Sequence, residues 1–294
     1  MVEEILLGDN PFIGVSHLSH SKAREDSKLG VETFAEVIIE AYRSGATGFT
    51  FSTHPTDLEI LRVVRERAPK VLESLSYYPL VPYGMAYVRR SNLTGLPGIG
   101  LDILKSSPWR LGRLSWILKT GLKLDPSLVL ALMLEHDLKP FLDVIPRGRV
   151  RAVLVHEVLT EVLIAHDAPH VFREFTGFFK EALGVPVGIE TRNICKLLRF
   201  AERHGVEVPY VMTPLNKLGY QMAPSRTEAE KCIGEMSANS RVIAINILAS
   251  GALSLREALE YLGKFRLYAV AVGTSKPWRA REVFPEVSEY LRSL

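Results

Sequence analysis

AVAVGTSKPWRAREVF, the stretch from Ala269 to Phe284, contains both kinds of element from which we expect the whole chain to be built. Its first part, Ala269–Gly273, is apolar and rich in β-branched valine, which is typical of a buried strand. A short polar turn begins at Gly273, and a helical stretch that carries Arg279 and Arg281 follows it. The stretch therefore predicts a buried strand that leads through a tight turn into a helix with a basic face.

The same alternation of short apolar runs and amphipathic stretches recurs along the chain. Strands are predicted at Ile5–Leu7, Gly48–Ser52, Val71–Ser76, Ala152–His156, Pro186–Glu190, Tyr210–Thr213, Val242–Asn246 and Ala269–Gly273. Helices are predicted at Val31–Ser44, Leu58–Arg67, Ile194–His204, Thr227–Ser237 and Ser254–Leu262. The last helix opens with a capping-box pattern of Ser254 and Glu257.

Eight strands that alternate with helices in 294 residues predict an α/β fold, a single (β/α)8 TIM barrel over residues 1–294. The alternative is an open doubly wound sheet. No G-x-G-x-x-G motif follows the first strand, which counts against the commonest form of that alternative.

The interval 77–150 is too long for one connection between a strand and a helix. Its first part is rich in Pro, Gly and Tyr, and LGRLSWILKTGL and PSLVLALMLEHDLKPFLDVI then show helical patterns. We therefore expect a helical excursion after strand three. It could cover the site as a lid, or pack Trp109, Trp116 and its leucines on the barrel wall, and these two roles are compatible.

The composition bounds the class of protein. Hydrophobic residues make up 47% of the chain, enough for a sizeable core without disulfides. Cys195 and Cys232 are far apart and have no metal-binding spacing, so they are weak evidence for a bridge and favour a reduced, cytoplasmic setting. The start of the chain lacks signal-peptide features, and no apolar run could span a membrane. A net charge of +3 is too small for a nucleic-acid binder, and no metal-ligand motif is present.

Polar side chains follow almost every predicted strand, at the end where barrels of this kind carry their sites. Such residues also form ordinary turns, but their abundance favours a catalytic or ligand-binding rim. The candidates for proton transfer or for orienting a substrate are His54, His156, Glu157 and Glu190. The candidates for holding a ligand or cofactor are Asp9, Asn10, Ser52, Asn193, Asn216, Asn246, Gly273, Thr274, Ser275, Lys276 and Arg279.

His156 ends the apolar run VRAVLVH, so we expect its ring at the mouth of the barrel, with a core histidine as the alternative. Burial there would disfavour the imidazolium, whereas the carboxylate of Glu157 or Glu190 would favour it, and the residues leave this balance open. Neighbouring strand residues point to opposite sides, so Glu190 is the expected partner of His156.

The turn GTSK stands directly before the helix that we expect to start near Pro277. Backbone N–H groups at a helix N-terminus favour an anion, and Lys276, Arg279 and Arg281 add positive charge. Barrels hold phosphate in the loops after strands seven and eight, and SGALS after strand seven supplies a second loop of small residues. We therefore expect a small anionic or phosphorylated ligand, against the plain alternative of a solvated basic helix start.

The second half of the chain resembles the aldo-keto reductases in the order of its motifs. The matching segments are VLVH at Val153–His156, VGIETRN at Val187–Asn193, PLNKLGYQ at Pro214–Gln221, VIAINILASGALS at 242–254 and AVGTSKPWRAREVF at 271–284. The resemblance implies a TIM barrel with NADP as the candidate cofactor. It also implies a substrate-site role for His156, a contact of Asn193 with the nicotinamide amide, and a place for the cofactor's adenosine phosphate after strand eight.

The first half departs from the catalytic aspartate, tyrosine, lysine and histidine of that family. Ser52 stands where the aspartate should end strand two, no tyrosine follows within a few residues, and no lysine ends strand three. We expect an enzyme, of oxidoreductase or lyase/isomerase type, that acts on a small anionic or phosphorylated ligand. The alternatives are an NADP-dependent oxidoreductase with a rearranged proton donor and a non-catalytic barrel that binds a nucleotide or metabolite.

Overall fold

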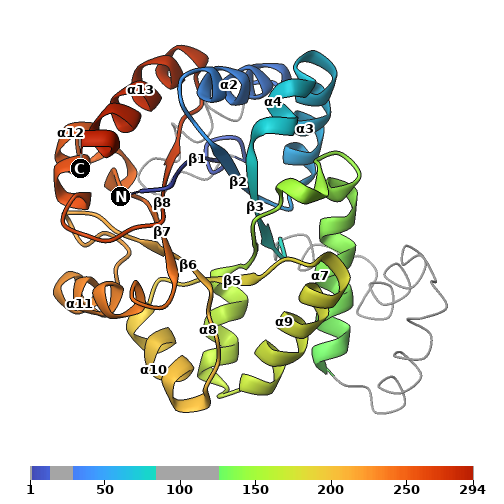
Figure 1. Ribbon diagram of the computed structural model, residues 1–294, viewed down its shortest axis with the longest axis vertical. Coiled ribbons are helices and arrows are strands. Elements are labelled where there is room, and N and C mark those ends of the chain that lie inside the picture. The colour runs from blue at the N-terminus through green and yellow to red at the C-terminus, as the bar shows by residue number, and fades with distance from the viewer. Residues whose placement is uncertain (1, 14–28, 84–125, 294) are drawn as a thin grey trace.

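The computed structural model describes residues 2–13, 29–83 and 126–293, and its strands form a closed parallel barrel ringed by helices (Figure 1). The strands are β1 (Glu4–Gly8), β2 (Gly48–Ser52), β3 (Ser76–Val81), β4 (Val153–Val155), β5 (Val187–Glu190), β6 (Tyr210–Pro214), β7 (Arg241–Ile245) and β8 (Ala269–Gly273). Each strand pairs with the next, and β8 pairs with β1. The predicted (β/α)8 barrel is confirmed.

The helices agree closely with the predicted ones. They are α2 (Val31–Arg43), α3 (Pro55–Arg67), α4 (Pro69–Ser74), α7 (Pro126–Leu142), α8 (Glu157–Ala165), α9 (Pro169–Leu183), α10 (Ile194–His204), α11 (Arg226–Met236), α12 (Leu255–Leu262) and α13 (Pro277–Ser293). Short 3-10 turns lie at Arg147–Arg149 and Ala249–Gly251. The capping box of Ser254 and Glu257 is present at the start of α12. The sequence patterns had not identified α8 and α9.

Strand three lies later in the chain than expected. The predicted strand at Val71–Ser76 is wrong, because Pro69 starts the one-turn helix α4, which buries Val71 and Leu72. β3 is instead Ser76–Val81, so the tyrosines at 77 and 78 lie inside the strand and not at its end. No lysine stands at the end of the corrected strand either, since SYYPLV is followed by Pro82.

Part of the expected excursion lies outside the described residues. The structure does not describe 84–125, which contain Trp109, Trp116 and the stretch LGRLSWILKTGL, so the lid remains a prediction. The helical pattern that begins at Pro126 is confirmed as α7, which packs against β3 and α9.

The two cysteines are joined, contrary to the expectation from their distance in the sequence. Cys195 in the first turn of α10 and Cys232 of α11 form a disulfide, with Cα atoms 5.4 Å apart. A separation of 37 residues spans one strand–helix repeat, which brings two consecutive helices side by side on the barrel wall. The prediction of a reduced, cytoplasmic setting relied on the two cysteines being unbonded, and the disulfide removes that support.

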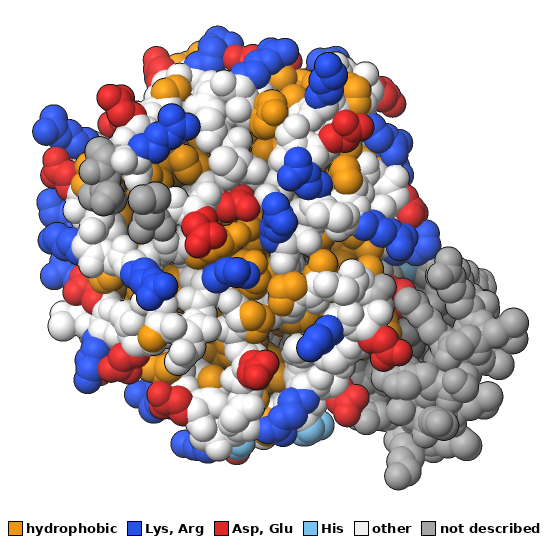
Figure 2. All heavy atoms as spheres, in the orientation of Figure 1, with side chains coloured by type: hydrophobic (Ala, Val, Ile, Leu, Met, Phe, Trp, Pro, Cys, Tyr) orange, Lys and Arg blue, Asp and Glu red, His pale blue; other side chains and the backbone are white. Residues whose placement is uncertain are grey.

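The helices and the surface charge bear on two of the expectations from composition. Among the described residues, no helix combines the length and apolar character needed to cross a bilayer. The face drawn in Figure 2 carries Lys and Arg side chains interspersed with Asp and Glu, without a field of one sign.

The inside of the barrel is filled by side chains that alternate along the strands, as the two-residue period of a strand requires. The cluster there comprises Leu6, Tyr78, Leu80, Ala152, Leu154, Tyr210, Met212, Ile243, Ala269 and Ala271. Large tyrosines lie in the same cluster as alanines. Gly188 of β5 has no room for a side chain, because an added Cβ would lie 2.4 Å from Leu154 Cδ2 and 2.7 Å from Tyr210 Cβ.

We predict that Gly188→Ala destabilises the protein by about 1–3 kcal/mol, because the methyl group overpacks the barrel interior. The measurement is the free energy of unfolding in urea. The matched control is Gly234→Ala in α11, where no atom lies within 4 Å of an added Cβ, and a small gain in stability is expected because alanine favours helix. Equal stability of the wild type and Gly188→Ala would contradict this account of the interior.

Candidate functional site

A cavity of about 420 Å³ lies at the carboxyl ends of the strands. It is referred to below as the mouth cavity. Most of the residues expected at the site line it: Asp9, Asn10, Ser52, His156, Glu190, Asn246, Gly273, Thr274, Ser275, Lys276 and Arg279. Closure of the barrel explains this gathering, because it brings the ends of strands that are far apart in sequence to one place.

Alternation along the strands explains which side chains point inward. Glu190 lies two residues after Gly188, and His156 lies two residues after Leu154, whose side chain fills the barrel. Both therefore share the inward face of their strands and reach the mouth cavity, as predicted for His156. Glu157, one residue further on, instead begins α8 and forms an ion pair with Arg192.

Four of the predicted site residues do not line the mouth cavity. Glu157 is one of them. His54 caps α3 by accepting a hydrogen bond from the Thr56 N–H at 3.1 Å. Asn193 caps α10 in the same way, through the Lys196 N–H at 3.1 Å. Asn216 is fully buried and exchanges two hydrogen bonds with the backbone of Tyr220, at 2.9 and 2.8 Å. Their side chains thus make local structural bonds.

Sequence reasoning missed several residues of the cavity because they are ordinary apolar or small side chains. The floor includes Thr50, Leu80, Met212, Ile245 and Ala271, and the rim includes Ser250, Gly251 and Trp278. The SGALS loop was identified as a small-residue loop, and Ser250 and Gly251 belong to it.

The pair of His156 and Glu190 is dominated by burial. The His156 Nδ1 and Glu190 Oε2 atoms are 4.0 Å apart, too far for a hydrogen bond. Burial lowers the pKa of His156 below its usual value, against a raising effect of the Glu157 charge. This settles the balance that the sequence left open. The Nδ1 atom accepts a hydrogen bond from the Val158 N–H at 3.3 Å, so the neutral ring carries its proton on Nε2.

Glu190 is a buried acid that keeps its proton at neutral pH. Burial, followed by the negative charge of Glu157, raises its pKa to about 8. One of its oxygens, Oε2, accepts a hydrogen bond from the Glu157 N–H at 3.1 Å, and this bond lowers the pKa of Glu190. His156 and Glu190 therefore form a polar wall of the mouth cavity that is mostly uncharged at pH 7.

A second buried carboxyl group, that of Asp9, directly follows β1. Asp9 accepts a hydrogen bond from the Ser52 N–H at 2.7 Å and lines the mouth cavity. Near it lies Asp57 of α3, which is fully buried and whose pKa is raised well above its usual range by burial and then by the negative charge of Asp9. The sequence did not reveal Asp57, because an acid in the first turn of a helix is ordinary.

The loop between β8 and α13 forms the basic side of the mouth cavity. α13 begins at Pro277, as predicted, and Thr274 and Ser275 before it are buried. Lys276 and Arg279 line the cavity. Arg281 was expected to add its charge here, but its guanidinium forms an ion pair with Glu40 of α2 at 3.0 Å.

The loop after β7 holds left-handed backbone at residues other than glycine. The φ angles are 53° at Asn246, 47° at Ala249 and 59° at Ser250. A hydrogen bond of 2.6 Å from Asn246 Nδ2 to Gln221 Oε1 fixes the first of these. Such conformations cost energy and gather at functional sites, and this loop lines the mouth cavity.

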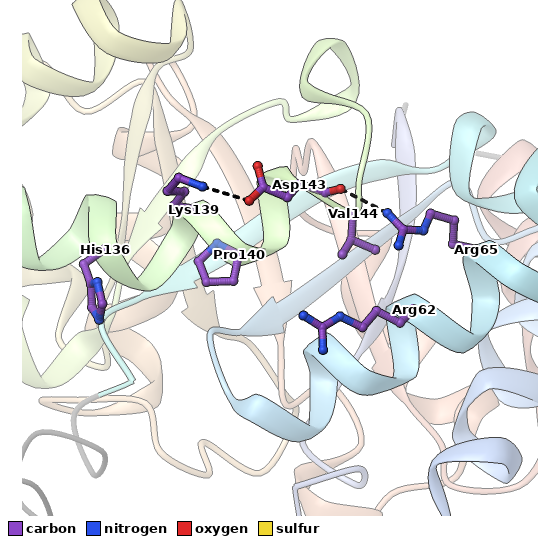
Figure 3. Close-up of a pocket in the computed structure, with 7 residues that line it drawn as sticks. All are labelled: Arg62, Arg65, His136, Lys139, Pro140, Asp143 and Val144. Atoms are coloured by element: carbon purple, nitrogen blue, oxygen red, sulfur yellow. Dashed lines mark hydrogen bonds and ion pairs between the residues drawn. The ribbon is translucent and has the colours of Figure 1, made fainter. Parts of the chain in front are cut away.

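A further hollow, of about 320 Å³, lies on the outer wall between α3 and α7 (Figure 3). Its charged side chains are partly engaged with one another. Lys139 Nζ lies 2.9 Å from Asp143 Oδ2, and Arg65 donates to the Asp143 carbonyl at 3.0 Å. It contains no buried acid, so the mouth cavity is the candidate functional site.

A closed (β/α)8 barrel with a polar cavity at its strand ends is the architecture of barrel enzymes. No protein-family model and no curated protein matches this sequence. Solved structures match it over nearly the whole chain. One, described as "the putative aldo-keto reductase from Pseudomona aeruginosa", has a TM-score of 0.62 and 16% identity, over 99% of this chain and 91% of that one.

Two further solved structures agree with this match. An aldo-keto reductase of Bombyx mori in complex with NADP has a TM-score of 0.54 and 10% identity, over 98% of this chain and 88% of that one. A glycerol dehydrogenase of Gluconobacter oxydans has a TM-score of 0.53 and 13% identity, over 98% and 89%. At these identities the likeness establishes the fold. The chain has the barrel of the aldo-keto reductases, as its motif order predicts.

We predict that Glu190→Gln changes how stability depends on pH. The folded-state pKa of about 8 lies above the ordinary value of 4.5, so wild-type stability should fall as pH rises between these two values and level off above them. The variant cannot ionise, so its stability relative to wild type should grow across this window, by up to ~1.4 kcal/mol per pH unit.

The measurement is urea unfolding of both proteins at a series of pH values. The matched control is Glu289→Gln, which removes an exposed carboxyl group of α13 and should keep the wild-type profile. Parallel profiles for Glu190→Gln and wild type would contradict the burial effect on Glu190.

Proposed function

We propose that the chain is an enzyme that binds a small anionic or phosphorylated ligand in the mouth cavity. The observation that carries the proposal is that two cationic side chains, a partly buried histidine and a buried glutamate line the same cavity: Lys276, Arg279, His156 and Glu190. The cations suit the charge of the ligand, and the buried groups suit proton transfer to it.

The start of α13 is the end of the cavity that would hold the anion. Backbone N–H groups at a helix N-terminus and the helix dipole both favour negative charge there. Lys276 and Arg279 add two formal charges beside it, and the loop after β7 lies across the cavity with the small residues Ser250 and Gly251. Barrel enzymes frequently hold phosphate between the loops after strands seven and eight.

The side formed by His156 and Glu190 would supply proton chemistry. A pKa near the working pH suits a general acid or base, since both protonation states are then accessible. Glu190, with a pKa of about 8, meets this condition. The neutral ring of His156 is expected to donate from Nε2 and orient the ligand, since its Nδ1 is occupied by the Val158 N–H.

A second candidate function is an NADP-dependent oxidoreductase with a rearranged proton donor. What favours it is the fold, since solved neighbours include a complex with NADPH and a complex with NADP. The phosphate of that cofactor would lie at the start of α13. The ordinary acid of the family would be missing, because β2 ends in Ser52 and β3 ends without a lysine.

We predict that Lys276→Ala and Arg279→Ala each weaken binding of inorganic phosphate and of NADPH by roughly tenfold, or ~1.4 kcal/mol, because each removes a charge-assisted bond to the anion. The loss should shrink as salt is added. The measurement is the fluorescence of Trp278, which lines the cavity and is half exposed. The matched control is Lys231→Ala, an exposed residue of α11. Unchanged affinity in both cavity variants would sink the anion site.

We also predict little reduction of aldehydes and ketones with NADPH, well below the ~10 s⁻¹ that is typical of enzymes. The reason is the absence of a tyrosine acid with a lysine to tune it. The measurement is NADPH absorbance across a panel of carbonyl compounds. Efficient turnover would instead select the second candidate function. A ligand that binds without any turnover would point to a non-catalytic metabolite-binding barrel.

A further inference from the structure

Asp57 is an unusual acid for its position in the fold. It lies in the first turn of α3, where a carboxylate ordinarily accepts hydrogen bonds from the free N–H groups of the helix. Its side chain is completely buried, and neither of its carboxyl oxygens has a hydrogen-bond partner among the described residues. A buried carboxylate without donors is very costly, so Asp57 must keep its proton.

The neighbouring group that acts on Asp57 is the carboxyl group of Asp9, whose negative charge raises the pKa of Asp57. Asp9 lines the mouth cavity, and we infer that it is the acceptor for the proton of Asp57. Asp9 is held in place by the Ser52 N–H, at 2.7 Å from its Oδ2 atom. Asp57 therefore donates to an acceptor that is itself fixed, and the pair reaches the ligand space through Asp9 alone.

We propose that Asp9 and Asp57 form a carboxyl pair that shares one proton and acts as an acid–base group of the mouth cavity, with Asp9 facing the ligand and Asp57 positioning it from behind. This rests on the proposed function only in taking the mouth cavity as the ligand site. Asp57 stands a few residues after Ser52, in the stretch where the resemblance expects a tyrosine acid.

The surroundings favour retention of the shared proton. Burial raises the pKa of Asp57 well above its usual range, and the negative charge of Asp9 acts in the same direction. Burial also raises the pKa of Asp9, against the lowering effect of the Ser52 bonds. The other charged or titratable groups that line the cavity are Glu190, His156, Lys276 and Arg279.

The singly protonated pair contains one acid and one base. Asp9, as the carboxylate, takes a proton from an O–H or C–H bond of the ligand, and the electron pair of that bond stays on the ligand. Asp57 keeps its own proton and stabilises Asp9 in both states through the hydrogen bond. Return of the proton from Asp9 to another ligand atom restores the pair, so no oxidant or reductant is needed.

The test follows the two carboxyl carbons by NMR in protein labelled at aspartate, across a pH titration. In wild type, we expect the pair to titrate in two separate steps, with one proton retained at neutral pH. Asp57→Asn preserves a donor to Asp9, so the Asp9 step should remain while the second step disappears. Asp57→Leu offers no donor, so the pKa of Asp9 should rise. The matched control is Asp143→Asn on the outer wall, which should leave both signals unchanged.

If Asp57 has a purely structural role, the titration of Asp9 should be the same in Asp57→Asn and in Asp57→Leu. That result, or a wild-type pair that is fully ionised at neutral pH, would overturn the proposal. Circular dichroism and urea unfolding check that each variant is folded. If Asp57→Leu fails to fold, Asp57→Asn still tests the proposal, because it keeps the shape of the side chain.

Inorganic phosphate separates this proposal from the proposed function. An anion in the mouth cavity should raise the pKa of Asp9, since it adds negative charge near the carboxylate. The response should be lost in Lys276→Ala combined with Arg279→Ala, whereas the two-step titration should survive. Absence of a phosphate response in wild type, with the two-step titration intact, would contradict the anion site and leave the carboxyl pair supported.

Discussion

The pairing of β1 with β8 is the constraint on which the site depends. These strands come from the two ends of the chain, and they pair in parallel from Glu4 opposite Ala269 to Gly8 opposite Gly273. The register places Asp9, which follows β1, beside Thr274, which follows β8. Without this closure the acid side and the basic side of the mouth cavity would belong to separate edges of an open sheet.

Burial then determines the chemistry of the groups that closure brings together. Around the mouth cavity burial is the largest influence on these groups, so the pKa of His156 is lowered and that of Glu190 is raised to about 8. Asp9 and Asp57 follow the same rule. Among the described residues that line the cavity, positive charge is carried by Lys276, which precedes α13, and by Arg279 in its first turn. A negatively charged ligand would therefore meet attraction at one side and protonatable groups at the others.

The barrel shares its fold with the aldo-keto reductases but differs from them at its strand ends. Ser52 ends β2 and uses its backbone N–H to hold Asp9, which follows β1. The first turn of α3 places Asp57 behind it. Fold alone does not transfer an activity, and the proton chemistry proposed for this cavity is assigned to its own buried acids.

Much of this protein was determined by its sequence, because strand and helix periodicity are local properties. The alternation of elements predicted the barrel, seven strands lie where apolar runs placed them, and the turn GTSK predicted the start of α13. The polar residues that follow the predicted strands include most of the polar residues of the cavity, because every parallel strand of a barrel ends at the same face.

Tertiary structure alone decided what depends on neighbours distant in sequence. Strand three lies at Ser76–Val81 and not at the predicted position. Val71 and Leu72 are buried by the short helix α4, and the local sequence pattern does not distinguish such a helix from a short strand. The disulfide of Cys195 and Cys232 required two helices to lie side by side. The burial of Asp57, which raises the pKa of its carboxyl group, arises only once α3 packs on the closed barrel, since desolvation is a property of the whole fold and not of any one segment.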